Sequence, residues 1–147
     1  MQFESSHLIA APVERVWQFL DDDEKRKLWM PEVEDTVYPD GNDKENPVGV
    51  RFRQRIREGG RISEYEGEVT AYDPPSLLGV RLSNPQFASD VIYRLRQEDG
   101  GTRLDYSAEL SLNSWIAKVM GVIARPLTSS IIRRHMRNLK RVAEGSF

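Results

Sequence analysis

The sequence contains no cysteine, which excludes disulfide bridges and thiolate chemistry. It has only two histidines, His7 and His135, and neither lies in a cluster with the spacing of a zinc site. No serine lies in a nucleophile-elbow sequence, and no glycine-rich loop has the spacing that cradles a phosphate. No apolar run approaches the roughly 18 residues of a membrane span, and nothing at the N-terminus resembles a signal peptide. We therefore expect a cytoplasmic protein that uses neither a metal nor a cofactor.

The charge of the chain is nearly balanced. Its 147 residues fit one domain (1–147) with a single core, and 21 basic against 23 acidic residues give a net charge of −2. This balance gives no general attraction to nucleic acid, and the oligomeric state is left open. The C-terminal stretch is locally basic, and we interpret it as a solvated helix face in preference to a surface for an anionic membrane or RNA. Its charged residues are Arg133, Arg134, Arg137, Lys140 and Arg141.

The stretch from Val48 to Ala71 predicts a β-hairpin, because apolar and charged residues alternate before and after Gly59 and Gly60. With these glycines as the two central turn residues, Glu58 lies opposite Arg61 and the register of the whole hairpin is defined. Three arginines of the first strand then face three glutamates of the second strand, which predicts a solvent-exposed face. The predicted pairs are Arg51–Glu68, Arg53–Glu66 and Arg55–Glu64.

The opposite face of this hairpin is expected to point inward. On its first strand the row runs from Val48 through Phe52 to Ile56. Two polar side chains, Gln54 and Tyr65, lie opposite one another in the middle of this apolar face. Because an unpaired buried amide costs on the order of 1–3 kcal/mol, these side chains either bond each other or line a cavity.

The N-terminal part of the chain predicts two short helices between strands. Pro12 opens the first helix, because proline suits a first helical position. The acidic run 21–24 is interpreted as helix capping in preference to a cation site. The other predicted elements before the C-terminal helix are a helix at 24–28 and strands at 3–9, 33–38, 78–82, 91–95 and 104–110.

Two further patterns occur in the C-terminal half. If Gln97 pairs with Thr102 across the turn at 98–101, two phenols, Tyr93 and Tyr106, face each other on the inner side of the sheet. A long helix then begins at residue 113 or 114, and its apolar residues keep roughly helical spacing up to residue 139. We expect a kink or a break just before Pro126, which lacks the amide donor and clashes with the preceding turn.

The order of these elements resembles the helix-grip fold of the START/Bet v 1-like (SRPBCC) superfamily. Four segments carry the resemblance: IAAPVERVW at 9–17, WMP at 29–31, EVTAYDPP at 68–75 and NLKR at 138–141. The third resembles the strand-to-turn signature of the bacterial polyketide-cyclase/dehydrase-like and CoxG-like members. The resemblance covers essentially the whole chain and implies an α+β fold, in which a curved antiparallel sheet wraps around the long C-terminal helix.

The resemblance also implies a cavity between the sheet and that helix, which relatives use for sterols, hormones, polyketides and other apolar molecules. Polar side chains of the inner rows would orient a ligand, and apolar side chains would contact it. The polar candidates are Gln54, Tyr65, Tyr93 and Tyr106, and the apolar candidates are Phe52, Val80, Leu82, Met120 and Ile123.

Three functions follow as hypotheses. The favoured one is binding or carriage of a hydrophobic small molecule, with no reaction. The second is a cofactor-free cyclase, dehydratase or hydrolase, which is weakened because the inner rows supply no general base. The third is a protein-interaction module resembling the Hsp90-activator domain, which an absent cavity would favour.

Overall fold

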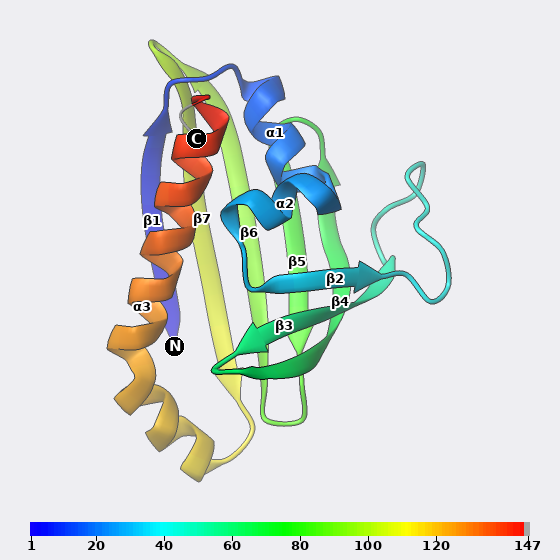
Figure 1. The fold of residues 1–147 in the computed structure, drawn as a ribbon, viewed down its shortest axis with the longest axis vertical. Helices are drawn as coiled ribbons and strands as arrows, with labels where there is room; N and C mark the ends of the chain where they lie inside the picture. Colours follow the sequence, from blue (N-terminus) through cyan, green and yellow to red (C-terminus); the bar gives the residue numbers. More distant parts are fainter. Residues whose placement is uncertain (146–147) are drawn as a thin grey trace.

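The computed structural model describes residues 1–145, which form a seven-stranded sheet and three helices (Figure 1). The strands are β1 (Gln2–Ile9), β2 (Val33–Val37), β3 (Arg51–Glu58), β4 (Arg61–Asp73), β5 (Leu77–Ser83), β6 (Phe87–Glu98) and β7 (Gly101–Leu112). The helices are α1 (Val13–Asp21), α2 (Asp23–Trp29) and α3 (Trp115–Ala143). This order of elements is the predicted one.

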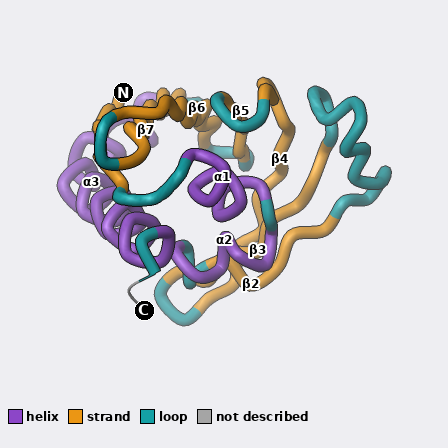
Figure 2. The backbone as a smooth tube through the Cα atoms, turned by 90° about the horizontal axis from the view of Figure 1, so that it is seen from above, coloured by secondary structure: helices purple, strands orange, loops and turns teal. Residues whose placement is uncertain are grey.

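All neighbouring strands of the sheet are antiparallel, in the order β1-β7-β6-β5-β4-β3-β2. Seen from above, the sheet is strongly curved (Figure 2). Helix α3 lies beside the β1 edge, and α1 and α2 lie across the open side. The predicted α+β helix-grip fold is therefore confirmed.

The β3–β4 hairpin has the predicted register. Glu58 pairs with Arg61, and Gln54 lies directly opposite Tyr65. Gly59 and Gly60 have φ values of +56° and +82°, a conformation that glycine adopts without steric cost. The local alternation and the glycine turn were therefore sufficient to define which residues of this hairpin face inward.

The ion pairs on the outer face of this hairpin differ from the prediction at one position. Arg51 and Arg53 pair with Glu68 and Glu66, at 3.8 Å and 3.2 Å between Nε and the carboxylate. Arg55 instead pairs with Asp35 of β2, at 3.7 Å. Arg55 does lie opposite Glu64, as predicted, but the ion pair expected between them does not form, because the sequence did not show that β2 adds to the free edge of β3 and brings its own carboxylate. Val48 is also not part of the inner row, since it precedes β3 and is 59% exposed.

The acidic run between α1 and α2 caps a helix, as predicted. The carboxylate of Asp22 accepts hydrogen bonds from the backbone N–H groups of Glu24 and Lys25, at 2.9 Å and 3.1 Å. These bonds satisfy donors that a helix start leaves unpaired. Within residues 1–145, no group of three acidic or histidine side chains could hold a metal ion.

The core lies where α1, α2 and the C-terminal end of α3 cover the concave face of the sheet. Its most deeply buried apolar side chains come from all of these layers, including Leu20 of α1, Trp29 of α2, Leu104 of β7 and Leu139 of α3. Burial of each such side chain contributes roughly 1.5–3 kcal/mol. This part of the molecule holds the C-terminal end of α3, from which the rest of the helix extends.

Helix α3 continues through Pro126 without a break, and Figure 1 shows it changing direction in the middle of its length. The kink is therefore present and the break is not. Only its C-terminal part packs on the core, through Met136, Leu139 and Val142. The apolar side chains of its N-terminal half, among them Met120 and Ile123, are exposed to solvent. Helical spacing identified an apolar stripe but could not show that the sheet fails to reach it.

One stretch of α3 has the composition of a membrane segment. An 18-residue window has a mean hydropathy of 1.2, and none of it is buried. By length and composition alone, α3 is the one helix among residues 1–145 that could cross a membrane. The sequence-based expectation was different because it required an uninterrupted apolar run, and Lys118 and Arg125 interrupt this one.

Candidate functional site

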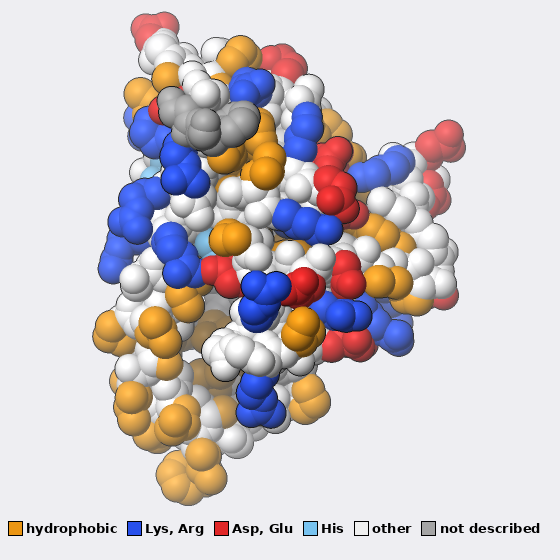
Figure 3. All heavy atoms as spheres, in the orientation of Figure 1, with side chains coloured by type: hydrophobic (Ala, Val, Ile, Leu, Met, Phe, Trp, Pro, Cys, Tyr) orange, Lys and Arg blue, Asp and Glu red, His pale blue; other side chains and the backbone are white. Residues whose placement is uncertain are grey.

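A cavity of about 440 Å³ lies between the concave face of the sheet, α2 and the middle of α3. Its walls are largely apolar, and they are formed by side chains of β1 and β3 to β7, of all three helices and of the loop between β2 and β3. In the space-filling view the surface is hollowed between the middle of α3 and the tip of the β3–β4 hairpin (Figure 3). Seven of the nine residues predicted as ligand contacts line it: Phe52, Gln54, Tyr65, Val80, Leu82, Tyr93 and Tyr106.

The other two predicted contacts, Met120 and Ile123, do not line the cavity. They are 58% and 67% exposed on the N-terminal half of α3. The α3 residues that do line it come later in the helix, beyond Pro126. They are Thr128, Ile131, Ile132, His135 and Met136.

Gln54 is the polar side chain whose surroundings most clearly indicate a missing partner. It is 4% exposed, it lines the cavity, and its Oε1 accepts no hydrogen bond from the described residues. Tyr65, directly opposite, does not bond it, because the Tyr65 hydroxyl donates to Glu58. Gln54 and Tyr65 were expected either to bond each other or to line a cavity, and the structure shows that they line the cavity. A buried acceptor without a donor costs about 1–3 kcal/mol, which a ligand donor would recover.

All five tyrosines of the chain line this cavity. Three of them donate to carboxylates: Tyr38 to Asp23, Tyr65 to Glu58 and Tyr72 to Asp21. Burial first, and then the acceptor carboxylate, raises the pKa of each of these phenols, to about 12 for Tyr72. They remain neutral hydroxyl groups near pH 7, and their donor function is already satisfied.

Tyr93 and Tyr106 differ from these three, because neither hydroxyl donates to a residue among 1–145. They are cross-strand neighbours with ring centroids 5.5 Å apart in an edge-to-face arrangement. Burial raises the pKa of Tyr93 to about 12 and also raises the pKa of Tyr106. Two neutral phenol donors are therefore available to a ligand carbonyl or hydroxyl on the β6–β7 wall.

His135 is the cavity residue that the sequence analysis missed. Its side chain is 14% exposed, it lines the cavity, and its Nε2 lies 2.8 Å from Oε2 of Glu32. Its ring also packs edge-to-face on Trp29, with centroids 6.5 Å apart. The sequence did contain an indication that His135 is buried, because it lies one turn before Leu139 on the same side of α3. The arginines around it, however, indicated a solvated face.

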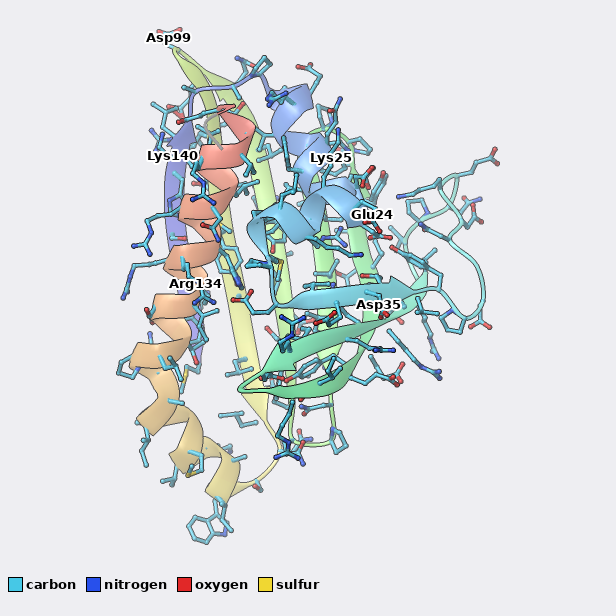
Figure 4. All side chains as sticks on the ribbon, in the orientation of Figure 1. Glu24, Lys25, Asp35, Asp99, Arg134 and Lys140 are labelled. Carbon is cyan, nitrogen blue, oxygen red and sulfur yellow. The ribbon has the colours of Figure 1, made fainter. Side chains whose placement is uncertain are left out.

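Glu32 holds the middle of α3 against the segment between α2 and β2. It accepts hydrogen bonds from Arg134, labelled in Figure 4, and pairs with His135. Burial alone would raise the pKa of Glu32, but the hydrogen bond with His135 and the nearby charge of Arg134 outweigh it, so that the pKa is lowered. We call Glu32, Arg134 and His135 the latch, because Glu32 in its ionised form joins this segment to the two α3 side chains.

We predict that Glu32→Gln lowers the free energy of unfolding by about 1 kcal/mol at about pH 7, because it removes a partly buried charge network. Since the pKa of Glu32 is depressed on folding, its stabilisation is present above the ordinary value of about 4.3 and is lost as pH falls below it. The difference between wild type and variant should vanish near about pH 3. Urea unfolding followed by circular dichroism at several pH values measures this difference.

Glu45→Gln is the matched control, because Glu45 lies on an exposed loop and forms no ion pair with a described residue. It should leave the stability unchanged at every pH. A Glu32→Gln variant as stable as wild type near neutral pH would show that the latch contributes nothing. The same conclusion would follow if the difference did not change with pH.

The geometry of Phe52 explains why a small residue lies next to it in the cavity wall. Phe52 is 6% exposed, and its ring covers Gly67, its partner on β4. A Cβ added at Gly67 would lie 2.1 Å from the Phe52 ring, so no larger residue fits without moving it. Gly67 therefore allows the aromatic ring to lie flat against the sheet and leaves the space in front of it open.

The fold and this cavity define a helix-grip domain that encloses a largely apolar, partly polar-lined space. The sequence matches a family model described as "Polyketide cyclase / dehydrase and lipid transport" over residues 1–144. The chain belongs to this family, within the SRPBCC superfamily that the sequence resembled. A comparison with curated proteins found no match.

Solved structures with the same fold include proteins of different origin. StfQ, a di-domain ARO/CYC from the steffimycin biosynthetic pathway, has a TM-score of 0.78 at 14% identity, covering 98% of this chain and 51% of StfQ. A Rhodobacter sphaeroides protein has a TM-score of 0.75 at 19% identity, covering 96% of this chain and 90% of its own. Ara h 8.0201 has a TM-score of 0.68 at 16% identity, covering 95% of this chain and 97% of its own. At these identities the similarity shows the fold alone.

Proposed function

We propose that the protein binds or carries a hydrophobic small molecule in the cavity between the sheet and α3. The observation that supports this most directly is the buried Oε1 of Gln54, which lacks a donor in a largely apolar wall. A plain core would not retain such a group, because its burial is costly without a hydrogen bond. The family to which the chain belongs includes lipid transport in its description, which agrees with an apolar ligand.

The polar groups of the cavity indicate the chemistry of this ligand. Gln54 offers an acceptor on the β3 wall, while Tyr93 and Tyr106 offer donors on the β6–β7 wall. A matching molecule has an apolar body, a hydroxyl or N–H group for Gln54 and a carbonyl or hydroxyl oxygen for the phenols. Lipid-like, polyketide-like and aromatic molecules with two oxygenated positions meet this description.

Native mass spectrometry of protein purified from its own host tests the proposal. We expect a bound apolar molecule that is released on denaturation. If no molecule co-purifies, the protein is titrated with N-phenylnaphthylamine, a neutral aromatic probe that carries one N–H donor. The titration measures the affinity of the cavity for this probe. A clean apo mass together with no saturable binding of this probe would contradict the proposal.

We predict that Gln54→Leu lowers the affinity for the bound molecule or probe by about fivefold, since a buried hydrogen bond is worth roughly 1 kcal/mol. The same change should leave the melting temperature unchanged or raise it, because it removes an unpaired buried acceptor. Gln86→Leu, on an exposed loop outside the cavity, is the matched control and should change neither quantity. A fall in melting temperature with unchanged affinity would mark Gln54 as a structural residue.

A second candidate function is favoured by one observation. His135 pairs with Glu32 at the cavity wall, and such a histidine would serve as the general base that the inner rows of the sheet do not provide. A carboxylate that orients a histidine is a recurrent arrangement for proton transfer, and a cofactor-free cyclase or dehydratase needs such a base. Incubation with the natural ligand distinguishes the two functions: a ligand recovered unchanged indicates a carrier, and a product lighter by one water indicates a dehydratase. The third hypothesis, an interaction module, is not supported by a cavity of about 440 Å³.

A further inference from the structure

The N-terminal half of α3 exposes an unusual amount of apolar surface. Seven large apolar side chains between residues 115 and 127 are between 49% and 74% exposed. Six of them are more than half exposed: Trp115, Ile116, Met120, Val122, Ile123 and Leu127. In Figure 3 hydrophobic side chains gather into an apolar area over the end of α3 that extends away from the sheet. Soluble domains rarely leave such a patch uncovered.

These side chains form one face of the helix. At 3.6 residues per turn, the seven exposed apolar positions fall within an arc of about 160°. Gly121 lies on the opposite side, and a Cβ added there would be 2.6 Å from the side chain of Leu112. Gly121 therefore marks the side of the helix that faces the sheet, and the apolar arc points outward. We call this arc, on residues 115–127, the apolar face.

The same outward arc becomes basic further along the helix. Arg133, Arg137 and Arg141 follow one another at intervals of four residues, which places them on neighbouring turns. None of the three forms a hydrogen bond or an ion pair through its side chain with residues 1–145. In Figure 3 basic side chains gather over the upper half of α3, directly next to the apolar area. Between residues 115 and 143 the helix has seven basic residues and no acidic residue.

This distribution of charge decides between the two simplest partners. If a second copy of the chain covered the apolar face, it would bring its own α3 close to this one. All charged residues of both helices are basic, and they would repel each other. The surface of an anionic lipid bilayer has the complementary charge, and each lysine or arginine near it contributes roughly 1 kcal/mol. The apolar face is about 20 Å long, at 1.5 Å per residue, and is too short for a hydrocarbon core of about 30 Å. It is therefore suited to insertion into the membrane surface and not to spanning.

We propose that the apolar face of α3 docks the protein on an anionic lipid bilayer, with Arg133, Arg137 and Arg141 over the headgroups. Docking in this way would also bring the cavity close to the bilayer surface. The α3 residues that line the cavity begin at Thr128, directly after the apolar face, and the hollow in Figure 3 lies beside it. An apolar ligand would then pass between bilayer and cavity with little exposure to water. Docking itself does not depend on the function proposed above.

Sedimentation with lipid vesicles tests this proposal. Wild-type protein should bind vesicles of phosphatidylglycerol and phosphatidylcholine, and it should bind pure phosphatidylcholine at least about tenfold more weakly. The triple variant Trp115→Gln, Val122→Gln, Ile123→Gln should lose at least about tenfold in vesicle affinity, because it removes the inserted apolar area. The variant Arg133→Gln, Arg137→Gln, Arg141→Gln should bind more weakly and with a smaller dependence on salt.

The matched control places the same substitution on exposed apolar residues elsewhere. Leu28→Gln, Val37→Gln, Ile62→Gln changes side chains that are 52%, 51% and 51% exposed and should leave vesicle binding unchanged. All variants should keep the wild-type melting temperature, since the replaced side chains are exposed. Binding of the soluble probe in the cavity should also persist, so that failure of docking and failure of ligand binding give different results.

Two results would overturn the proposal. The first is equal vesicle binding by wild type and by the triple α3 variant. The second is a dimer in light scattering that the triple variant converts to a monomer, without any binding to vesicles. In that case the apolar face is a contact between copies of the chain.

Discussion

Replacement of Trp29 by alanine is expected to lower the free energy of unfolding by about 3–5 kcal/mol. Trp29 is 1% exposed, and its indole N–H donates to the backbone oxygen of Phe19 at 2.8 Å. Its ring packs edge-to-face against Tyr93 and His135, with centroid distances of 6.2 Å and 6.5 Å. Trp29→Ala therefore removes a large apolar side chain and leaves a carbonyl without its donor. Urea unfolding followed by far-ultraviolet circular dichroism measures the loss.

Two comparisons make this prediction sharper. Trp115→Ala is the matched control, because Trp115 is 74% exposed and its removal should change stability by less than about 0.5 kcal/mol. Trp29→Phe retains an aromatic ring and loses the hydrogen bond, so it should have an intermediate effect of about 1–3 kcal/mol. If Trp29→Ala and Trp115→Ala had similar effects, the core described around α2 would be wrong.

The second large effect is expected on binding. Val80→Trp should lower the affinity for the bound molecule or for N-phenylnaphthylamine by at least about 100-fold, equivalent to roughly 2.8 kcal/mol. Val80 lines the cavity from the middle of β5, between Val69 and Val91 of the neighbouring strands. An indole at this position would occupy part of the about 440 Å³ that a ligand needs. Fluorescence titration of the probe measures the change.

Ile62→Trp is the matched control for this experiment. Ile62 is 51% exposed on β4 and does not line the cavity, so the added indole should leave the affinity unchanged. The apolar face of α3 can also bind an aromatic probe. The difference in probe binding between wild type and the triple glutamine variant of that face measures this background. Unchanged probe binding by Val80→Trp, after subtraction of this background, would place the ligand site outside the cavity and contradict the proposed function.

Several parts of the fold could be predicted from local sequence because the determining interactions are local. The register of β3 and β4 follows from alternating residues and from Gly59 and Gly60, whose positive φ values allow a tight turn. The pairing of Tyr93 with Tyr106 follows in the same way from the turn after β6. A hairpin contains all the information about its own inner face, since neighbours in space are close in sequence.

The interactions that the sequence missed join distant segments. Arg55 pairs with Asp35, because the chain turns back in the long loop after β2 and places β3 beside it. His135 and Glu32 are separated by 103 residues, and only the docking of α3 beside α2 brings them together. Periodicity identifies the apolar face of a helix or strand but does not identify which segment covers that face. For this reason the arginines around His135 led to the wrong prediction that His135 lies on a solvated helix face.

The sequence by itself determined that this chain is an α+β helix-grip domain and which residues of its hairpins point inward. Tertiary structure alone decided what those inward residues enclose. Helix α3 packs on the core only through its C-terminal part, so that a cavity remains beneath its middle and the apolar side chains of residues 115–127 stay uncovered. The physical reason is that an apolar helical stripe is the same in sequence whether a sheet, a ligand, a membrane or water lies against it.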